Sequence, residues 1–213
     1  TLSIAKTAQP AAGECKRFYY NEEVCRPSRE SHTFQTIHQM GLECMGEVDE
    51  AAQAEVLRLA LASLAALDVP TVLEVSHMGF VTGLLDVLDV PATAHARLVE
   101  LLCAKNEHEL RKAALQAGAD EAGADALCGL LTLHGPFGAT LTAAKAAAIS
   151  PSQKAALAEL LALQNALGEA GRGLQLDLSM ADEADQAAGH GAVHGSQQGQ
   201  NGVLQADVGV GHR

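Results

Sequence analysis

The sequence between residues 16 and 46 places the strongest constraint on the fold. Residues 16–26 and 34–46 are rich in aromatic and β-branched side chains, which favour strands. The segment P-S-R-E-S at 27–31 separates them and supplies Pro and Ser, which are turn residues. The pattern therefore predicts an antiparallel pair of strands joined by a charged loop.

The neighbouring sequence predicts two helices and two more strands. After Asp49, a favoured N-cap, residues 50–67 repeat Val and Leu at helical spacing. Residues 71–76 are rich in β-branched side chains and lead into a helical pattern at 79–88. Residues 174–178 alternate Leu with polar side chains, which indicates a strand with one buried face.

The segment 92–168 has an almost wholly helical pattern. Capping signals occur at Asn106, with Glu109 three residues later, and at Ser150, with Gln153 three residues later. Gly118 and the sequence H-G-P at 134–136 interrupt the pattern, because Gly and Pro end helices. We therefore expect a helical insertion of four or five helices at 92–170.

The composition narrows the class of protein. The chain has 213 residues, 48% of them hydrophobic, which fits one domain or one and a fraction. Only 3% of the residues are aromatic, which favours helix packing. A formal net charge of −12 disfavours a nucleic-acid partner, because such partners are held by Lys and Arg. Five widely spaced Cys without a C-x-x-C pair favour reduced thiols and a cytoplasmic location. No apolar run approaches the roughly 20 residues of a membrane helix, so no membrane partner is expected.

Residues 181–213 differ in composition from the rest of the chain. They contain no aromatic residue, many Gly, Gln and Ala, and few Val or Leu. Such a segment offsets little of its ordering entropy by burial, so we expect a poorly ordered tail. The chain begins with Thr1 rather than Met, which is consistent with a fragment whose upstream part is missing.

Five segments, taken in order, resemble the regulatory subunit of ATP phosphoribosyltransferase, a paralogue of class II histidyl-tRNA synthetases. Residues 19–46 resemble motif 2 of those synthetases. The other four segments resemble stretches of the regulatory subunits, and the resemblance extends from residue 1 to about 180. They are T-L-S-I-A-K at 1–6, E-V-S-H-M-G-F-V-T-G-L-L at 74–85, K-N-E-H-E-L at 105–110 and L-D-L-S-M at 176–180.

This resemblance implies a fold and a function. The implied fold is α+β, with a class II synthetase-like antiparallel sheet flanked by helices. Residues 1–91 would form part of the core, 92–170 the helical insertion and 171–180 the return strand. The implied function is that of a non-catalytic regulatory subunit in the first step of histidine biosynthesis. Its partners would be a short-form catalytic subunit, in a hetero-oligomer, and L-histidine as effector.

The resemblance also points to ligand-binding residues, and none of them is catalytic. Gln39 and Glu43 lie four residues apart on one strand and therefore share a face. By resemblance these two residues line a histidine pocket, with Thr1 at its edge. Arg26 matches the arginine that holds the ATP α-phosphate in synthetases, but the acidic residues and the Pro around it favour an ion pair instead. His77, at a strand-to-helix turn, is a further ligand candidate or a histidine bonded to backbone.

Two other functions remain open at this point. A true histidyl-tRNA synthetase needs a Tyr-Tyr loop, where this chain has A-D-E-A-D-Q from 181, a change that suggests a frameshift or an incorrectly joined end. An all-helical interaction module would make the motif 2 likeness a coincidence. His190 and His194 lie among Gly residues that disfavour a helix, so no metal site is assigned, and no cofactor is expected.

Overall fold

The computed structural model describes residues 8–27, 33–66, 71–180 and 202–207. Only the backbone is described at positions 26, 27, 35, 37, 39 and 202–207. The chain divides into two compact units, Thr1–Thr71 with Ser196–Arg213 and Val72–Gly195. Each unit is described by itself below.

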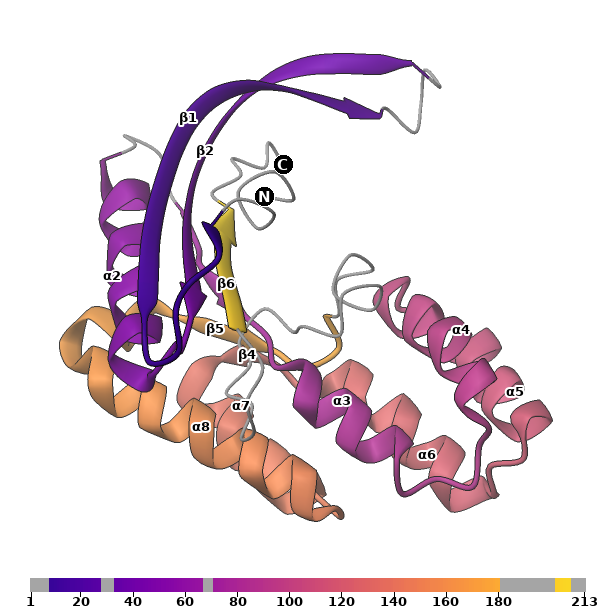
Figure 1. The fold of residues 1–213 in the computed structure, drawn as a ribbon. Helices are drawn as coiled ribbons and strands as arrows, with labels where there is room; N and C mark the ends of the chain where they lie inside the picture. Colours follow the sequence, from indigo (N-terminus) through magenta and orange to yellow (C-terminus); the bar gives the residue numbers. More distant parts are fainter. Residues whose placement is uncertain (1–7, 28–32, 67–70, 181–201, 208–213) are drawn as a thin grey trace. The chain divides into compact units, whose positions relative to one another are not determined.

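The first unit is built on a long antiparallel ribbon. Strand β1 (Cys15–Pro27) pairs with β2 (Phe34–Gly46) along its whole length, from Cys15 opposite Gly46 to Pro27 opposite Phe34. The ribbon curves strongly along its length (Figure 1). This arrangement confirms the strand pair predicted from the aromatic and β-branched pattern.

A third strand, β6 (Gly202–Asp207), extends this sheet by pairing with the C-terminal half of β2. The strand order is β1-β2-β6, and both pairings are antiparallel. Strand β6 lies within the segment that we expected to be a poorly ordered tail. Its backbone pairs with residues 41–46, which are more than 150 positions away, and such a distant partner leaves no local sequence signal. The remainder of the expected tail lies outside the described residues.

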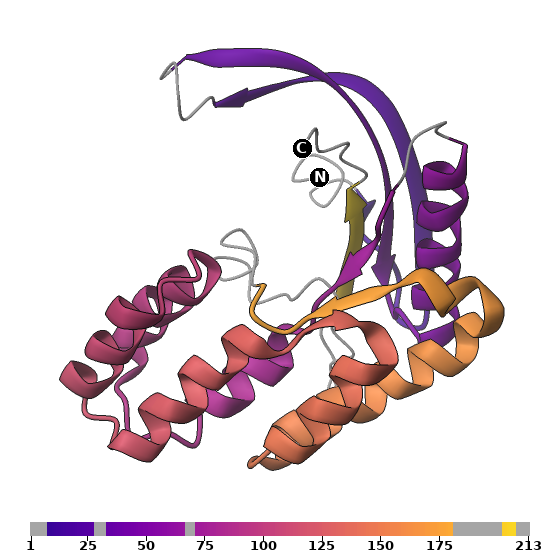
Figure 2. The ribbon, with the colours of Figure 1, turned by 180° about the vertical axis from the view of Figure 1, so that it is seen from behind.

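Helix α2 (Glu50–Ala65) packs on the convex side of the ribbon (Figure 2). The side chain of Asp49 accepts a hydrogen bond of 2.8 Å from the backbone N–H of Ala52, as expected of this N-cap. Arg17 on β1 bonds Glu55 on α2, with 2.8 Å between its Nη2 and the carboxylate. The apolar side of the helix is buried and comprises Ala52, Ala54, Val56, Leu57, Ala60 and Leu64.

The second unit contains a small three-stranded sheet. Its strands are β3 (Glu74–Val75), β4 (His134–Pro136) and β5 (Gln175–Asp177), in the order β3-β5-β4. Strand β5 runs parallel to β3 and antiparallel to β4. The expected strand at 71–76 is therefore shorter than predicted. The H-G-P sequence does interrupt the helices as expected, and it forms an edge strand because β5 provides its partner.

Besides the sheet, the described part of this unit (residues 72–180) contains six α-helices and two short 3₁₀-helices. Helix α3 packs on α8, α7 packs on α8, and α4 and α5 lie side by side (Figures 1 and 2). Their apolar sides supply a leucine-rich core in which Leu110, Leu160, Leu176 and Leu178 are completely buried. The helices are α3 (Met78–Leu85), α4 (Ala92–Cys103), α5 (Glu107–Ala117), α6 (Glu121–Gly129), α7 (Phe137–Ala147) and α8 (Pro151–Leu167).

The two capping signals have different outcomes. At α8, the side chain of Ser150 accepts from Gln153 N–H, and the side chain of Gln153 accepts from Ser150 N–H, so the predicted capping box is confirmed. At α5, the side chain of Asn106 accepts from Glu109 N–H, as predicted. The reciprocal half is not formed at this site, because Asn106 N–H instead donates to the carbonyl of Leu101 at the end of α4.

The boundary between the two compact units lies between Thr71 and Val72. Segment 72–91 lies in the same unit as the helices that follow it, because β3 pairs with β5 and α3 packs on α8. The assignment of 1–91 as part of the core, of 92–170 as an insertion and of 171–180 as a return strand stays a prediction. Within the described residues, no helix combines the length and the apolar character that a membrane span requires.

Candidate functional site

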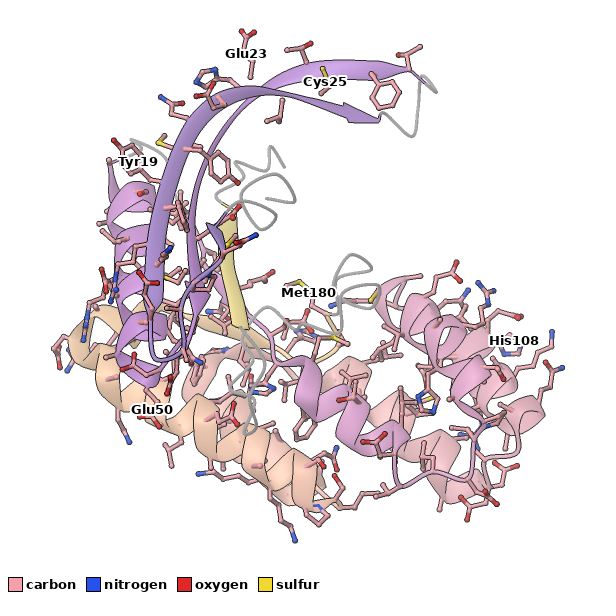
Figure 3. All side chains as sticks on the ribbon, in the orientation of Figure 1. Tyr19, Glu23, Cys25, Glu50, His108 and Met180 are labelled. Atoms are coloured by element: carbon pink, nitrogen blue, oxygen red, sulfur yellow. The ribbon has the colours of Figure 1, made fainter. Side chains whose placement is uncertain are left out.

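The β1–β2 ribbon has two faces with different surroundings, since side chains alternate along a strand. Arg17 and its cross-strand partner Cys44 lie on the face against α2, which we call the outer face. Tyr19 and Glu23 share this face by alternation, and Figure 3 shows both pointing away from the concave side. The opposite, inner face is therefore the one available to form a site within the concave side of the ribbon.

Glu43 lies on the inner face, opposite Phe18, and is only 1% exposed. A buried carboxylate is costly unless it receives hydrogen bonds, so it is a strong acceptor for N–H donors. The backbone register places Gln39 opposite Glu22 and Arg26 opposite Gln35. Positions 26, 39 and 43 therefore belong to the same face of the ribbon.

Spacing along the strand separates these three positions. Consecutive positions are four residues apart in register, which corresponds to about 13 Å at the rise of a β-strand. Gln39 and Glu43 are thus close enough to contact opposite ends of one amino acid, whereas Arg26 lies a further step along the ribbon. Thr1 lies outside the described residues. The ligand roles of Thr1, Arg26, Gln39 and Glu43 stay predictions.

The described cations at the base of the ribbon bond the protein itself. Lys16 Nζ donates to the carbonyl of Ala8 at 3.0 Å and lies 3.6 Å from the carboxylate of Glu14. Arg17 is bonded to Glu55 on the outer face, and this hydrogen bond raises the pKa of Arg17. These two cations therefore do not form a phosphate-binding cluster on the inner face.

His77, the remaining candidate, belongs to the second unit. Its side chain is buried and caps α3, with Nδ1 accepting a hydrogen bond of 3.1 Å from Gly79 N–H. Its Nε2 lies 3.1 Å from the carboxylate of Glu159 on α8. Because Nδ1 accepts, Nε2 carries the proton and donates to Glu159. The structure thus shows the backbone-bonded arrangement that was one of the two interpretations of His77, and its role toward a ligand stays a prediction.

Sequence reasoning missed a polar network at the end of β5. Asp177 accepts hydrogen bonds from Lys105 Nζ at 2.8 Å, from Ser179 N–H at 2.9 Å and from the Ser179 hydroxyl at 2.6 Å. Lys105 has a φ of 51°, a left-handed conformation that favours Gly, in the turn between α4 and α5. The K-N and L-D-L-S segments both matched the resemblance, but only the fold brings these two segments together.

This network controls the protonation of Asp177. Burial by itself raises the pKa of Asp177, but the hydrogen bonds from Lys105 and Ser179 outweigh it and hold the pKa below its ordinary value of 3.8. A depressed pKa means that the folded state binds the proton more weakly than the unfolded chain does. The ionised carboxylate therefore stabilises the fold above the ordinary pKa, and this contribution is lost as the pH falls through the folded-state value.

We expect Asp177→Asn to lower the free energy of unfolding by about 1 to 2 kcal/mol at pH 7, because an amide cannot pair with the Lys105 ammonium group. The difference from the unaltered protein should shrink as the pH falls below about 4. Urea denaturation at several pH values measures both effects. Asp125→Asn is the control, since Asp125 pairs with Arg111 at the surface and should cost less than about 1 kcal/mol. An Asp177→Asn deficit that is independent of pH would contradict this account.

In the described part of the chain, the arrangement of possible metal ligands and the protonation of two buried thiols bear on the chemistry of the protein. There, no group of three or more His, Cys, Asp or Glu side chains is arranged to hold a metal ion. Burial raises the pKa of Cys44 to about 11 and also raises the pKa of Cys128. Both of these thiols are therefore protonated at neutral pH, which makes them poor nucleophiles.

The curved antiparallel sheet with helix α2 on its convex side, together with the solved structure that matches it, places the chain in the class of proteins with a class II aminoacyl-tRNA synthetase-like fold. A solved ATP phosphoribosyltransferase regulatory subunit/histidyl-tRNA synthetase from Bacillus halodurans matches 84% of this chain and 46% of its own, with a TM-score of 0.66 and 25% identity. The family model for histidyl-tRNA synthetase matches residues 1–189. This chain belongs to the histidyl-tRNA synthetase family.

Two further relatives are informative. An ATP phosphoribosyltransferase regulatory subunit from Thermus thermophilus is 33% identical over 143 residues, which are 67% of this chain and 38% of that protein. The chain thus spans well under half of this relative. An ATP phosphoribosyl transferase (HisG:HisZ) complex from Thermotoga maritima matches 86% of this chain and 64% of the solved chain, with a TM-score of 0.62 and 18% identity. At this low identity, the likeness supports the fold alone.

Proposed function

We propose that this chain acts as the regulatory subunit of ATP phosphoribosyltransferase, in the first step of histidine biosynthesis. The observation that carries the proposal is the 33% identity to a protein of that name, together with five ordered segments that resemble the same family. In this role the chain catalyses no reaction itself. It binds a short-form catalytic subunit in a cytoplasmic hetero-oligomer and makes that subunit active.

The proposed effector site is the inner face of the ribbon around Glu43. L-Histidine carries an ammonium group, a carboxylate and an imidazole ring with N–H donors. The buried Glu43 carboxylate suits one of these N–H groups, and Gln39, four residues away on the same face, supplies an amide for the other end of the ligand. Feedback then requires only that histidine binds the active and inactive states of the assembly with different affinities.

The charges around the ribbon favour this role over aminoacyl adenylation. A polyphosphate binds best where several cationic side chains, above all those of Arg, point into one site. Lys16 and Arg17 bond other parts of the first unit, and Arg26 is surrounded in the sequence by Glu22, Glu23 and Glu30. The net charge of −12 also opposes a tRNA partner.

Two assays on the same purified protein test the proposal against an active synthetase. We expect addition of the chain to a short-form ATP phosphoribosyltransferase to raise its activity, and the two proteins to co-purify. We expect no histidine-dependent exchange of pyrophosphate into ATP. Exchange without activation would show that the chain is a synthetase, and activation without exchange would support the regulatory role.

We expect Glu43→Gln to weaken L-histidine binding at least about tenfold, because a hydrogen bond to a charged group contributes about 1.5 to 3 kcal/mol. Isothermal titration calorimetry with L-histidine measures the effect. Glu23→Gln is the matched control, since Glu23 is an exposed carboxylate on the outer face of the same ribbon. Equal histidine affinity in the Glu43→Gln and Glu23→Gln proteins would rule out Glu43 as a ligand.

A further inference from the structure

Tyr20 and Gly41 form a close cross-strand pair on the inner face of the ribbon. The two residues lie directly opposite each other in the register. The phenol ring of Tyr20 occupies the space where a side chain at position 41 would begin. A Cβ on Gly41 would lie 2.9 Å from Cε1 of Tyr20, and closer still to its Cζ and Oη. Only Gly at position 41 lets the ring lie this close to the backbone of β2.

The ring is placed between the two residues of the proposed effector site. Gly41 lies two residues from Glu43 and two residues from Gln39, and all three positions belong to the inner face. Each step of two residues is about 7 Å along the strand. Tyr20 therefore presents an aromatic ring between the buried carboxylate of Glu43 and position 39.

An aromatic ring at this place favours one class of ligand side chain. The face of a phenol ring carries negative charge density, which attracts cations. The ring also stacks with other flat rings. The imidazole of histidine is flat and becomes a cation when protonated, whereas an uncharged aliphatic side chain has neither property and an amide side chain carries no charge. Beside a buried carboxylate, such a ring would increase the preference for imidazole.

We propose that Tyr20, seated on Gly41, is the aromatic wall of the amino-acid site and a determinant of its specificity for the imidazole ring of L-histidine. This inference rests on the proposed histidine site around Glu43. It assigns to the phenol ring a direct contact with the ligand, in addition to covering the backbone of β2.

The tyrosine content of the chain allows a direct spectroscopic test. The sequence contains two Tyr and no Trp, and the two Tyr are neighbours on opposite faces of β1. In the Tyr19→Phe protein, Tyr20 is the only strong fluorophore, and in the Tyr20→Phe protein only Tyr19 remains. Titration with L-histidine should change the emission of the Tyr19→Phe protein saturably, with a midpoint equal to the dissociation constant from calorimetry. The Tyr20→Phe protein should show no change in emission.

Affinities provide a second readout. We expect Tyr20→Leu to weaken L-histidine binding about tenfold or more, while Tyr20→Phe, which keeps the ring, stays within about threefold of the unaltered protein. Tyr19→Leu is the matched control, because Tyr19 is 84% exposed on the outer face, and it should leave the affinity unchanged. Circular dichroism confirms that each variant is folded before titration.

The outcomes separate this inference from the proposed function. If calorimetry detects no L-histidine binding by the unaltered chain, the histidine site fails and the inference fails with it. If histidine binds but the Tyr19→Phe emission does not change, only the role of Tyr20 is overturned. A Tyr20→Phe protein as weak as Tyr20→Leu would also overturn it, because the ring alone would then not account for the contact.

Discussion

Replacing Gly46 with Ala is expected to lower the free energy of unfolding of the first unit by about 3 kcal/mol or more. Gly46 ends β2 with a φ of +113°, a conformation that side chains strongly disfavour. A Cβ at this position would also lie 3.0 Å from Cβ of Pro10 and closer still to the carbonyl oxygen of Glu14. That oxygen accepts a hydrogen bond of 3.0 Å from Glu47 N–H, so relieving the clash would break the bond.

A second glycine separates backbone strain from steric conflict. Gly13 also has a positive φ, of +78°, but a Cβ there would meet only the Glu47 carboxylate, at 3.9 Å. Gly13→Ala should therefore cost about 1 to 2 kcal/mol, from strain alone. Chemical denaturation followed by circular dichroism measures both variants. If the Gly46→Ala protein were no less stable than Gly13→Ala, the packing of the Glu14 carbonyl against the end of β2 would be wrong.

The elements that sequence reasoning located well are those with local causes. The strands at 15–27 and 34–46 follow from β-branched and aromatic residues around a Pro-containing turn. The start of α8 follows from Ser150, whose capping box involves only neighbours in the sequence. Such features need no knowledge of the remainder of the chain.

The elements that were missed or misjudged have distant causes. Strand β4 exists because β5 offers a partner about 40 residues later, and β6 exists because β2 offers one far earlier in the chain. The N–H of Asn106 was expected to bond the side chain of Glu109, but it donates instead to the carbonyl of Leu101 at the end of α4. Propensities and motifs describe short windows of sequence, so they cannot predict strand partners or hydrogen-bond partners that are distant in the sequence.

The same division applies to the candidate site. Alternation along a strand was enough to predict that Gln39 and Glu43 share a face, and the register confirms this for the backbone. The Tyr20–Gly41 pair gave no signal, because it depends on which residue of β1 lies opposite which residue of β2. The partner of His77 was equally hidden, since Glu159 lies 82 residues away on another helix.

In the second unit, the largest loss of stability is expected from Leu160→Ala, at about 2 to 5 kcal/mol. Leu160 is 0% exposed and belongs to α8, the helix on which both α3 and α7 pack. Removing its side chain loses apolar burial and leaves a cavity. Because α3 and α7 both pack on α8, the helices cannot easily move inward to fill this cavity. Thermal or urea denaturation of the variant measures the loss.

The neighbouring residue supplies a control with the same chemistry and a different environment. Leu161→Ala removes the same side-chain volume as Leu160→Ala, but Leu161 is 37% exposed, so fewer buried contacts are lost. It should lower the free energy of unfolding by less than about 1 kcal/mol. Because the proposed effector site lies in the first unit, histidine binding by a folded Leu160→Ala protein should stay within about twofold of the unaltered value. Equal losses of stability in the two variants would show that the side of α8 assigned to the core is wrong.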